Sequence, residues 1–411
     1  MSLFTLSWKN LVDKPLSAIL SLLLFALGVG LIALVFLIEH QLDRQFRRNM
    51  AGVDLVIGAK GSPLQLVLSS LFHLDAPTGN ISLEEAGAFL RPDHPLIERA
   101  IPLSLGDSHE GFRIVGTQPS ILDHYGAGLS EGRVWEKPME VVLGTAAARR
   151  LDYDLGDTFQ STHGLDDNED LLHEDAGAFR VAGILEPTGT VIDQLILTAP
   201  ESVWAVHGHE DGGAVDYHVH DSIPLYEHTN EEITAILATF RARNVQTLNF
   251  PRLINENTNL LAANPSYEVS KLFAQLGQGE RILRILGYVI VLVSSFSIFI
   301  SLFQSLRDRR YELAIMRTLG ASPGTLFLLI LLEGLLLAFG GYLLGLALAH
   351  GGLEVGRMFT TDTYRFPFTG LDFLPGEAYL LLGALVIGAL ASILPAWQAR
   401  NTDIHETLAE G

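Results

Sequence analysis

Imidazole and carboxylate side chains are concentrated in one part of the chain, where they could bind a metal ion. Seven of the 14 histidines fall between residues 163 and 228, among many Asp and Glu residues. This combination of ligands suits zinc or a similar divalent ion. A solvated acidic loop in which histidine is incidental is the simpler interpretation, because ligand clusters in loops are compositional signals. The candidate ligands are His163, His173, His207, His209, His218, His220 and His228.

Enzymatic motifs are weak in this sequence. His207-Gly-His209-Glu-Asp211 begins like the His-x-His-x-Asp pattern of metallohydrolases, but Gly212 stands where the next histidine belongs. The sequence contains neither His-Glu-x-x-His nor a Gly-x-x-x-x-Gly-Lys-Ser/Thr phosphate loop, so we expect no enzyme and no ATP site in this chain. The absence of cysteine excludes disulfides and thiolate chemistry.

A second group of polar side chains, from Asp308 to Ala321, stands between two long apolar runs. Its composition favours a helix, and Gly320 suits the left-handed position that ends one. Ser322 can cap the next helix, and Pro323 fits that helix's first turn. The segment therefore predicts a short amphipathic helix along the membrane surface, between two membrane helices.

Four apolar runs are long enough to cross the hydrocarbon core of a bilayer. Lys and Arg gather in the short segments on one side, so the positive-inside rule predicts that both termini are cytoplasmic. The first run is long for a signal peptide and lacks a small-residue cleavage site after it. The expected spans are residues 17–38, 285–303, 325–349 and 378–397, with cytoplasmic segments at 1–16, 304–322 and 398–411 and a short outer loop at 350–377.

The long segment at residues 39–266 is expected to face outward. Residues 40–280 contain 35 acidic and 16 basic residues, a formal charge of −19, which disfavours nucleic acid as a partner. Strand-like and helix-like stretches alternate here, so we expect an α+β domain, followed by a stalk helix at 267–284 that enters the second span. The predicted strands are Val53–Ile57, Phe112–Gly116, Glu140–Gly144, Phe179–Leu185, Val245–Phe250 and one that begins at Tyr217; the predicted helices follow Ser82 and span Asn230–Arg241.

Polar and small residues inside the spans predict contacts between helices. Glu333 lies in the third span, where an acid is a functional candidate by default, as a relay or pairing group. Snorkelling or pairing with a neighbouring helix is the alternative, because Glu333 lies near the cytoplasmic interface. Gly341, Gly345 and Gly388 belong to small-residue patterns at four-residue spacing. Such patterns fit either close contact inside one bundle or a dimer interface.

The sequence resembles the FtsX-like permease family of ABC transporters, of the MacB type, over most of its length. The likeness is most specific in Arg310–Ala321, which is similar to the family's coupling helix. It extends to Glu333-Gly334 and Gly340-Gly341 with Gly345 in the third span, and to Pro395–Ala399 at the end of the fourth. Outside the spans, Gly132-Arg133, Val141–Gly144, Gly156–Thr158 and Phe179–Ile184 resemble landmarks of the periplasmic core domain.

The resemblance implies four transmembrane helices and an α+β periplasmic domain of the MacB core type. Within that domain we expect a porter-like part, residues 53–140 and 213–250, and an inserted subdomain, residues 141–212. The tail departs from the family, because Ile404–Leu408 stands where Pro-Val-Glu-Ala-Leu is common. The residues expected to couple to an ATPase are Arg309, Arg310, Glu312, Leu313, Met316, Arg317 and Gly320, with the arginines meeting polar groups and Leu313 and Met316 filling a groove.

The expected partners are two copies of a separate ABC ATPase, which would supply ATP and Mg²⁺, and a second copy of the permease in an inner membrane. A periplasmic adaptor or a lipoprotein is a further expected partner. Three functions remain open at this stage: export or extraction of a substrate by mechanotransmission, activation of a periplasmic partner such as a cell-wall hydrolase without transport, and a zinc-linked system that uses the histidine-rich loops.

Overall fold

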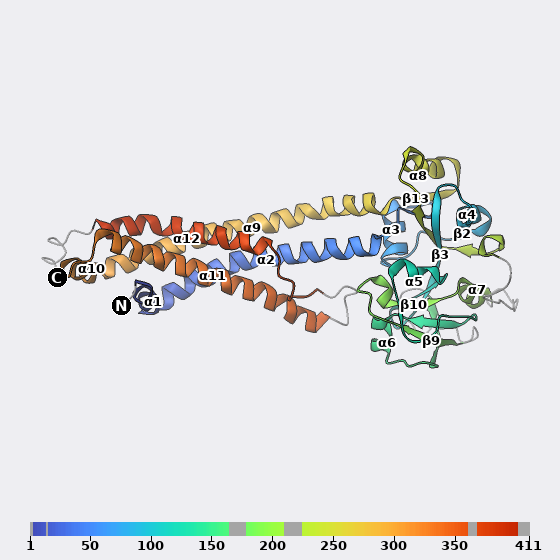
Figure 1. The fold of residues 1–411 in the computed structure, drawn as a ribbon, viewed down its shortest axis with the longest axis horizontal. Coiled ribbons are helices and arrows are strands. Elements are labelled where there is room, and N and C mark those ends of the chain that lie inside the picture. Colours follow the sequence, from blue (N-terminus) through green and yellow to red (C-terminus); the bar gives the residue numbers. More distant parts are fainter. Residues whose placement is uncertain (1–2, 14, 164–177, 209–223, 361–367, 402–411) are drawn as a thin grey trace. The chain divides into compact units, whose positions relative to one another are not determined.

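The computed structural model describes residues 3–13, 15–163, 178–208, 224–360 and 368–401 of the chain. The chain forms two compact units (Figure 1). The helical unit comprises Met1–Asp43 and Gln275–Gly411, and the α/β domain comprises Arg44–Ala274. Two helices, α2 and α9, contribute residues to both units.

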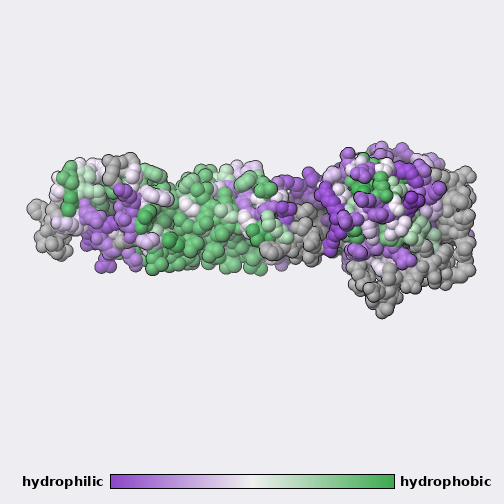
Figure 2. Space-filling view, turned by 90° about the horizontal axis from the view of Figure 1, so that it is seen from below, coloured by the Kyte–Doolittle hydropathy of each residue, from purple (hydrophilic) through white to green (hydrophobic). Residues whose placement is uncertain are grey.

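Four helices of the described chain are long and apolar enough to cross a membrane, which confirms the predicted fold class. They are α2 (Pro15–Met50), α9 (Pro265–Asp308), α11 (Pro323–Thr360) and α12 (Gly376–Arg400). Hydrophobic residues cover the helical unit along the middle of its length, as expected of a surface that meets lipid (Figure 2). Two short helices complete this unit: α1 (Leu3–Asp13) precedes α2, and α10 (Arg310–Thr318) connects α9 to α11.

Small residues let the helices of this unit approach one another closely. A Cβ atom added to Gly345 of α11 would lie 2.8 Å from the carbonyl oxygen of Ala26 in α2. One added to Gly341 would lie 2.9 Å from the ring of Phe25, and one added to Gly388 of α12 would lie 2.5 Å from Ala338 in α11. The three glycines singled out from the sequence therefore make contacts inside the chain's own bundle, the first of the two alternatives.

The α/β domain is built on one 11-stranded sheet with the order β13-β1-β12-β3-β4-β10-β6-β9-β5, to which β7 and β8 add at β9 and β3. Most neighbours are antiparallel, but β10 runs parallel to β4, and β6 runs parallel to β9. A separate pair joins β2 and β11. The strands are β1 Leu55–Ala59, β2 Ile81–Ser82, β3 Ile97–His109, β4 Phe112–Thr117, β5 Leu129–Gly132, β6 Glu140–Leu143, β7 Thr158–Phe159, β8 Thr162–His163, β9 Phe179–Leu185, β10 Leu195–Thr198, β11 Glu232–Ile233, β12 Ala235–Phe240 and β13 Leu260–Ala263.

Short helices connect these strands: α3 Pro63–Leu71, α4 Leu83–Leu90, α5 Ser120–Tyr125, α6 Thr145–Leu151, α7 Pro200–Gly208 and α8 Val245–Asn257. Four predicted strands are confirmed as β1, β4, β6 and β9, and Ser82 caps α4 through the backbone N–H of Glu85, as expected. The strands of residues 141–212 extend the same sheet, since β4 pairs with β10. β5, which lies outside that range, pairs with β9.

Two predicted elements are wrong. The helix expected at Asn230–Arg241 is replaced by β11 and β12, because Ala235–Phe240 inserts between β1 and β3, where residues 235–238 are buried. A central sheet position thus overrides the helix-favouring composition. The strand expected at Val245–Phe250 is instead the start of α8, where Asn244 and Thr247 form a reciprocal capping box.

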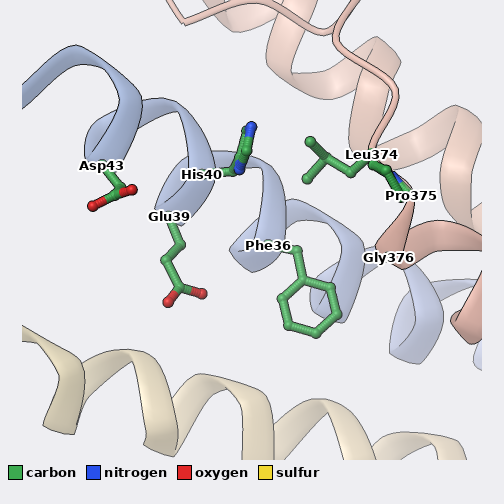
Figure 3. A pocket seen from close by; sticks show the side chains of 7 residues that line it. All are labelled: Phe36, Glu39, His40, Asp43, Leu374, Pro375 and Gly376. Carbon is green, nitrogen blue, oxygen red and sulfur yellow. The ribbon is translucent and has the colours of Figure 1, made fainter. Parts of the chain in front are cut away.

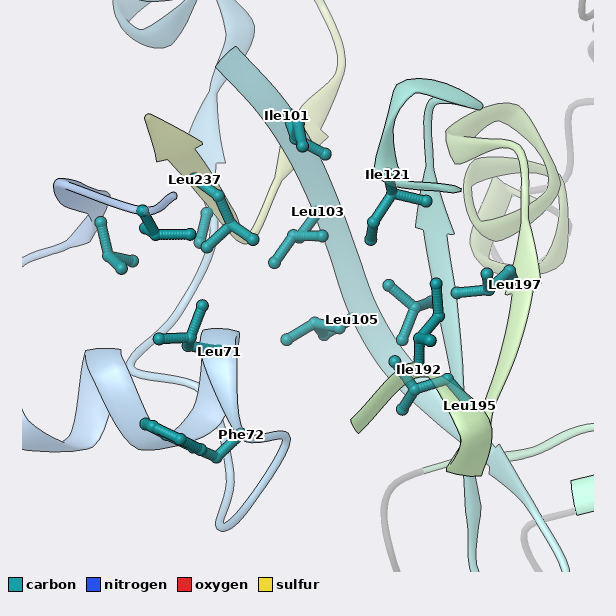
Figure 4. Close-up of a cluster of buried hydrophobic side chains, with 14 of the residues drawn as sticks. Leu71, Phe72, Ile101, Leu103, Leu105, Ile121, Ile192, Leu195, Leu197 and Leu237 are labelled. Atoms are coloured by element: carbon teal, nitrogen blue, oxygen red, sulfur yellow. The ribbon is translucent and has the colours of Figure 1, made fainter. Parts of the chain in front are cut away.

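A large hydrophobic core fills one face of the sheet. Ile101, Leu103 and Leu105 of β3 point to the same side, as the two-residue period of a strand requires, and belong to one buried cluster with Leu71 and Leu195 from other elements (Figure 4). Trp135 is the largest side chain that is fully buried in this core.

The ends of both long helices belong to this core. Phe46, in the last turns of α2, lies 4.6 Å from the ring of Phe72 and 5.2 Å from that of Phe273 in α9. Val269 of α9 is buried in the same cluster. Asn49 of α2 accepts a hydrogen bond of 2.9 Å from the backbone of Val191. The α/β domain therefore includes the last turns of α2 and the first turns of α9 as structural parts.

Candidate functional site

The turn between α9 and α11 has the local structure that its sequence predicts. α9 ends at Asp308, and Gly320, after α10, adopts a φ of +101°, which strongly favours glycine. The hydroxyl of Ser322 accepts a hydrogen bond from the backbone of Thr325 at 3.2 Å, and Pro323 begins α11. The segment thus consists of the short helix α10 and the turn that follows it, and both have defined ends.

One face of α10 is buried within the chain. Leu313 is only 3 % exposed and packs with Leu306 of α9, and Met316 is partly buried beside it. Leu313 is therefore buried within this chain, which contradicts the prediction that it fills a groove in an ATPase, whereas the same prediction for partly buried Met316 stays untested. The remaining buried members of this cluster are Leu326, Leu329, Ile330, Ala396 and Ala399.

The opposite face of α10 presents an exposed apolar stripe that the sequence reasoning missed. Tyr311, Ile315 and Leu319 are all exposed, Leu319 to 82 %. Tyr311 and Ile315 are four residues apart on one side of α10, and Leu319, four residues further on, is the C-cap that follows the last residue of the helix. This spacing was the available signal. Arg310 and Glu312 are exposed beside the stripe, and half-buried Arg317 donates to the carbonyl of Arg400 at 3.4 Å.

Arg309 points into the chain and not toward a partner surface, which corrects its predicted role. Its side chain is 11 % exposed, and its Nη2 donates a 2.7 Å hydrogen bond to the backbone carbonyl of Asn10 in α1. Nη1 lies 3.9 Å from a carboxylate oxygen of Glu333, and Nη2 lies 3.9 Å from Asp13. This arginine thus joins α1 and α11 at the junction of α9 and α10.

Glu333 is 1 % exposed and accepts a 2.6 Å hydrogen bond from the side-chain amide of Asn10. The structure therefore supports pairing with a neighbouring helix over snorkelling. α1 is further attached to α11 by Ser7, whose hydroxyl donates to the carbonyl of Leu329 at 3.2 Å.

Most of the candidate zinc ligands lie outside the described residues. This holds for His173, His209, His218 and His220, as it does for the strand expected at Tyr217. His163 lies in β8 and His207 in α7, but their side chains are not among those described. His228 is half-buried, with its ring 5.8 Å from that of Trp204. Within the ranges that the structure describes, no group of three His, Asp or Glu residues could hold a metal.

An ion pair fixes the start of β6. The guanidinium of Arg133 donates to both carboxylate oxygens of Glu140, at 2.6 and 2.8 Å. This hydrogen bonding lowers the pKa of Glu140 to about 2. The backbone N–H groups of Glu136 and Lys137 donate to the same carboxylate, so the group is held in its ionised form.

A cavity of about 350 Å³ lies in the helical unit, between α2 and the start of α12 (Figure 3). Glu39, at its edge, pairs with Arg284 of α9 at 3.1 Å, and the guanidinium of Arg284 lies 5.2 Å from the ring centre of Phe36. The cavity therefore combines apolar and acidic walls. It is lined by Phe36, Glu39, His40, Asp43, Leu374, Pro375 and Gly376.

Comparison with known families gives two matches that together cover most of the chain. Residues 18–223 match the MacB-like periplasmic core domain, and residues 284–404 match the FtsX-like permease C-terminal domain. The second match contains α10, the exposed stripe and Glu333.

Comparison with individual proteins gives weaker likenesses. The lipoprotein-releasing system transmembrane protein LolC of Xylella fastidiosa is 26 % identical in strain 9a5c and 25 % identical in strain Temecula1, each over 175 residues. This region is 39 % of the present chain and 40 % of LolC, so the chain spans about two fifths of these relatives. A solved extracellular domain of the noncanonic ABC-type transporter YknZ from Gram-positive bacteria matches 52 % of this chain and 99 % of that one, with 11 % identity and a TM-score of 0.30.

Proposed function

The chain belongs to the FtsX-like permease family of ABC transporters, with a MacB-like periplasmic core domain, and we propose that it transmits the motion of a separate ABC ATPase to its α/β domain for the export or extraction of a substrate. Four apolar helices and a periplasmic-type domain fit a protein of the inner membrane. In the proposed orientation the termini and α10 are cytoplasmic and the α/β domain is periplasmic.

The continuity of α9 carries this proposal. Its first turns contribute Val269 and Phe273 to the core of the α/β domain. The same helix runs to Asp308, one residue before Arg309 and the start of α10. An α-helix is stiff along its axis because each turn is hydrogen-bonded to the next. A displacement of α10 therefore has a direct structural route to the domain core.

The exposed surface of α10 supports the proposal that the ATPase binds to this helix. Tyr311, Ile315 and Leu319 offer an apolar contact for a groove in the ATPase, and Arg310 and Glu312 flank it with charges of both signs. Large apolar and aromatic residues at the centre of an interface with polar residues at its rim are typical of protein–protein contacts. Two copies of the chain on two ATPase copies complete the proposed assembly.

The likeness to LolC favours extraction of a substrate over the regulatory alternative, because those relatives are components of a lipoprotein-releasing system by name. A lipid-anchored cargo is the corresponding proposal for this chain. The acidic charge of residues 40–280 favours partners with basic surfaces at the periplasmic side.

A break in α9 tests the proposal. Between Phe273 and Arg284, none of the described side chains is buried, and a Cβ added to Gly277 or Gly279 would meet nothing within 4 Å. A proline in this stretch, Gln278→Pro, removes a helical hydrogen bond and destabilises the helix by about 3 kcal/mol. Gly277→Ala is the matched control, because alanine stiffens the same turn without a clash.

The measurement is hydrogen exchange in the α/β domain, with and without ATP, in the complex of the chain and the ABC ATPase that purifies with it. We expect ATP-dependent changes in the wild type and in Gly277→Ala, and their loss in Gln278→Pro while the complex still assembles. Unchanged ATP-dependent exchange in Gln278→Pro would refute transmission through α9.

A further inference from the structure

Two hydrogen-bond donors approach the same oxygen of Glu333. The Nδ2 of Asn10 in α1 lies 2.6 Å from Oε1 and is hydrogen-bonded to it. The Nη1 of Arg309 lies 3.9 Å from the same Oε1, which is too far for a hydrogen bond. This Nη1 is buried and donates no hydrogen bond within the described part of the chain. The carboxylate of Glu333 is thus hydrogen-bonded to the neutral amide of Asn10, and the charged guanidinium of Arg309 lies next to it without a hydrogen bond.

The alternative pairing is energetically accessible. A hydrogen bond from a guanidinium to a carboxylate has about 2.8 Å between its heavy atoms and gains the attraction of two opposite charges, which a neutral amide donor lacks. A shift of roughly 1 Å in Arg309 would bring Nη1 to that distance. Glu333 and Arg309 are nearly shielded from water, at 1 % and 11 % exposure, so each unmade hydrogen bond is costly. The hydrogen bond gained by Arg309 would therefore be strong enough to compete with the Asn10 contact.

Arg309 is placed to convert motion into this exchange. It is the single residue between the end of α9 and the start of α10, so its guanidinium follows α10. Its Nη2 is held by the carbonyl of Asn10 at 2.7 Å, and the exposed Asp13 lies 3.9 Å from the same nitrogen. Both contacts come from α1. The donors around Glu333 thus connect α1, α10 and α11 at one point.

We propose that Asn10 and Arg309 are alternative partners of Glu333, and that their exchange accompanies the movement of α10, so that α1 is a working part of the coupling device. The proposal rests on the proposed function, because it assumes that α10 moves. It assigns Asn10 and Glu333 as positioning residues, and it predicts two populated arrangements of α1 relative to α10.

The chain contains no cysteine, so two introduced cysteines provide the only labelling sites. Spin labels at Phe4→Cys in α1 and Thr318→Cys in α10, both at exposed positions, report the separation of the two helices by pulsed electron resonance in lipid nanodiscs. Glu333→Gln keeps an acceptor for Asn10 but removes the charge that attracts Arg309. Asn10→Ala removes the competing donor.

We expect these two substitutions to change the ratio of the two distance populations in opposite directions, each by roughly tenfold, the effect of one hydrogen bond to a charged group. Asn10→Leu, which removes the amide donor at similar size and adds no charge, is expected to act like Asn10→Ala. Ser7→Ala is the matched control, since it removes another contact between α1 and α11 without touching Glu333. The control is expected to leave the ratio unchanged.

A shift in the same direction for Asn10→Ala and Glu333→Gln, or one no larger than that of Ser7→Ala, would overturn the exchange and leave Asn10 as a structural tether. This result is separable from a failure of the proposed function. The labelled chain is measured without the ATPase, whereas Gln278→Pro tests transmission with it, so a failure of the exchange leaves the proposed function standing and is distinguishable from its failure.

Discussion

Truncation of Leu313 and truncation of Leu319 are expected to have opposite effects: the first should reduce the stability of the chain, and the second should weaken its binding to the ATPase. Leu313→Ala removes a side chain that is 3 % exposed and packed against α9, α11 and α12. Truncation of a buried leucine destabilises a protein by about 2–5 kcal/mol. Leu319 is 82 % exposed, so Leu319→Ala should change the stability of the chain by no more than about 0.5 kcal/mol.

ATPase binding should be weakened more by Leu319→Ala than by Leu313→Ala. Burying a whole leucine side chain contributes about 1.5–3 kcal/mol, and 82 % of Leu319 is available for burial by a partner. The expected loss for Leu319→Ala is therefore about 1.2–2.5 kcal/mol, or roughly an 8- to 60-fold weaker complex. Leu248→Ala in α8 is the matched control, because Leu248 is 80 % exposed but lies in the α/β domain.

The assay has two parts for each variant in nanodiscs: thermal unfolding, and the concentration of the chain that half-maximally stimulates ATP hydrolysis by the purified ATPase. Leu319→Ala should raise that concentration without a change in unfolding temperature, whereas Leu313→Ala should lower the unfolding temperature. A Leu319→Ala variant that binds like Leu248→Ala, together with a stable Leu313→Ala that binds weakly, would show that the assignment of the two faces is reversed.

Three further predictions concern other parts of the chain. Gly345→Val should separate α2 from α11 and destabilise the helical unit by about 1–3 kcal/mol, measured by thermal unfolding, whereas Gly383→Ala, where a Cβ meets nothing within 4 Å, should not. Because the pKa of Glu140 falls from 4.5 to about 2 on folding, its stabilising contribution is present above pH 4.5 and is lost as the pH falls toward 2. Glu140→Gln should lower the free energy of unfolding at pH 7 by about 1 kcal/mol or less, given the partial exposure of Arg133, and should reduce the loss of stability between pH 4.5 and 2. Equal pH dependence in both proteins would contradict the assignment. For zinc, which stays a proposal, replacement of His207, His209, His218 and His220 by Asn should weaken binding of Zn²⁺ to the full chain in calorimetry, and unchanged binding would exclude these residues as ligands.

The sequence was sufficient where one periodicity or composition determines an element. The four apolar helices, the strands at Phe112–Thr117 and Phe179–Leu185, and the positive φ at Gly320 follow from length, alternation and glycine chemistry. The strand at Ala235–Phe240 does not, because its conformation is imposed by β1 and β3, which come from distant parts of the sequence.

The sequence alone could not predict which face of α10 is buried, because that also depends on residues from distant parts of the sequence. Leu313 and Ile315 are similar in chemistry, and packing against residues of α9, α11 and α12, such as Leu329 and Ala396, decides which of the two is buried. The inward position of Arg309 depends likewise on Asn10, which lies 299 residues away. A partner-facing assignment for a helix needs the neighbours that cover its other face.

The pairing of β1 with β13 restricts the kind of motion that the α/β domain can receive. β1 begins five residues after α2 ends, and β13 ends two residues before α9 begins, and the two strands are hydrogen-bonded in fixed register, with Val56 opposite Ala263. Axial sliding of one helix past the other by a single residue, about 3.4 Å, would turn the buried side chains of the moving strand to the wrong face. Tilting or twisting of the helices as a pair keeps the register intact. In the proposed function, this fixed register therefore favours rotation of the domain by its two helices over shear between them.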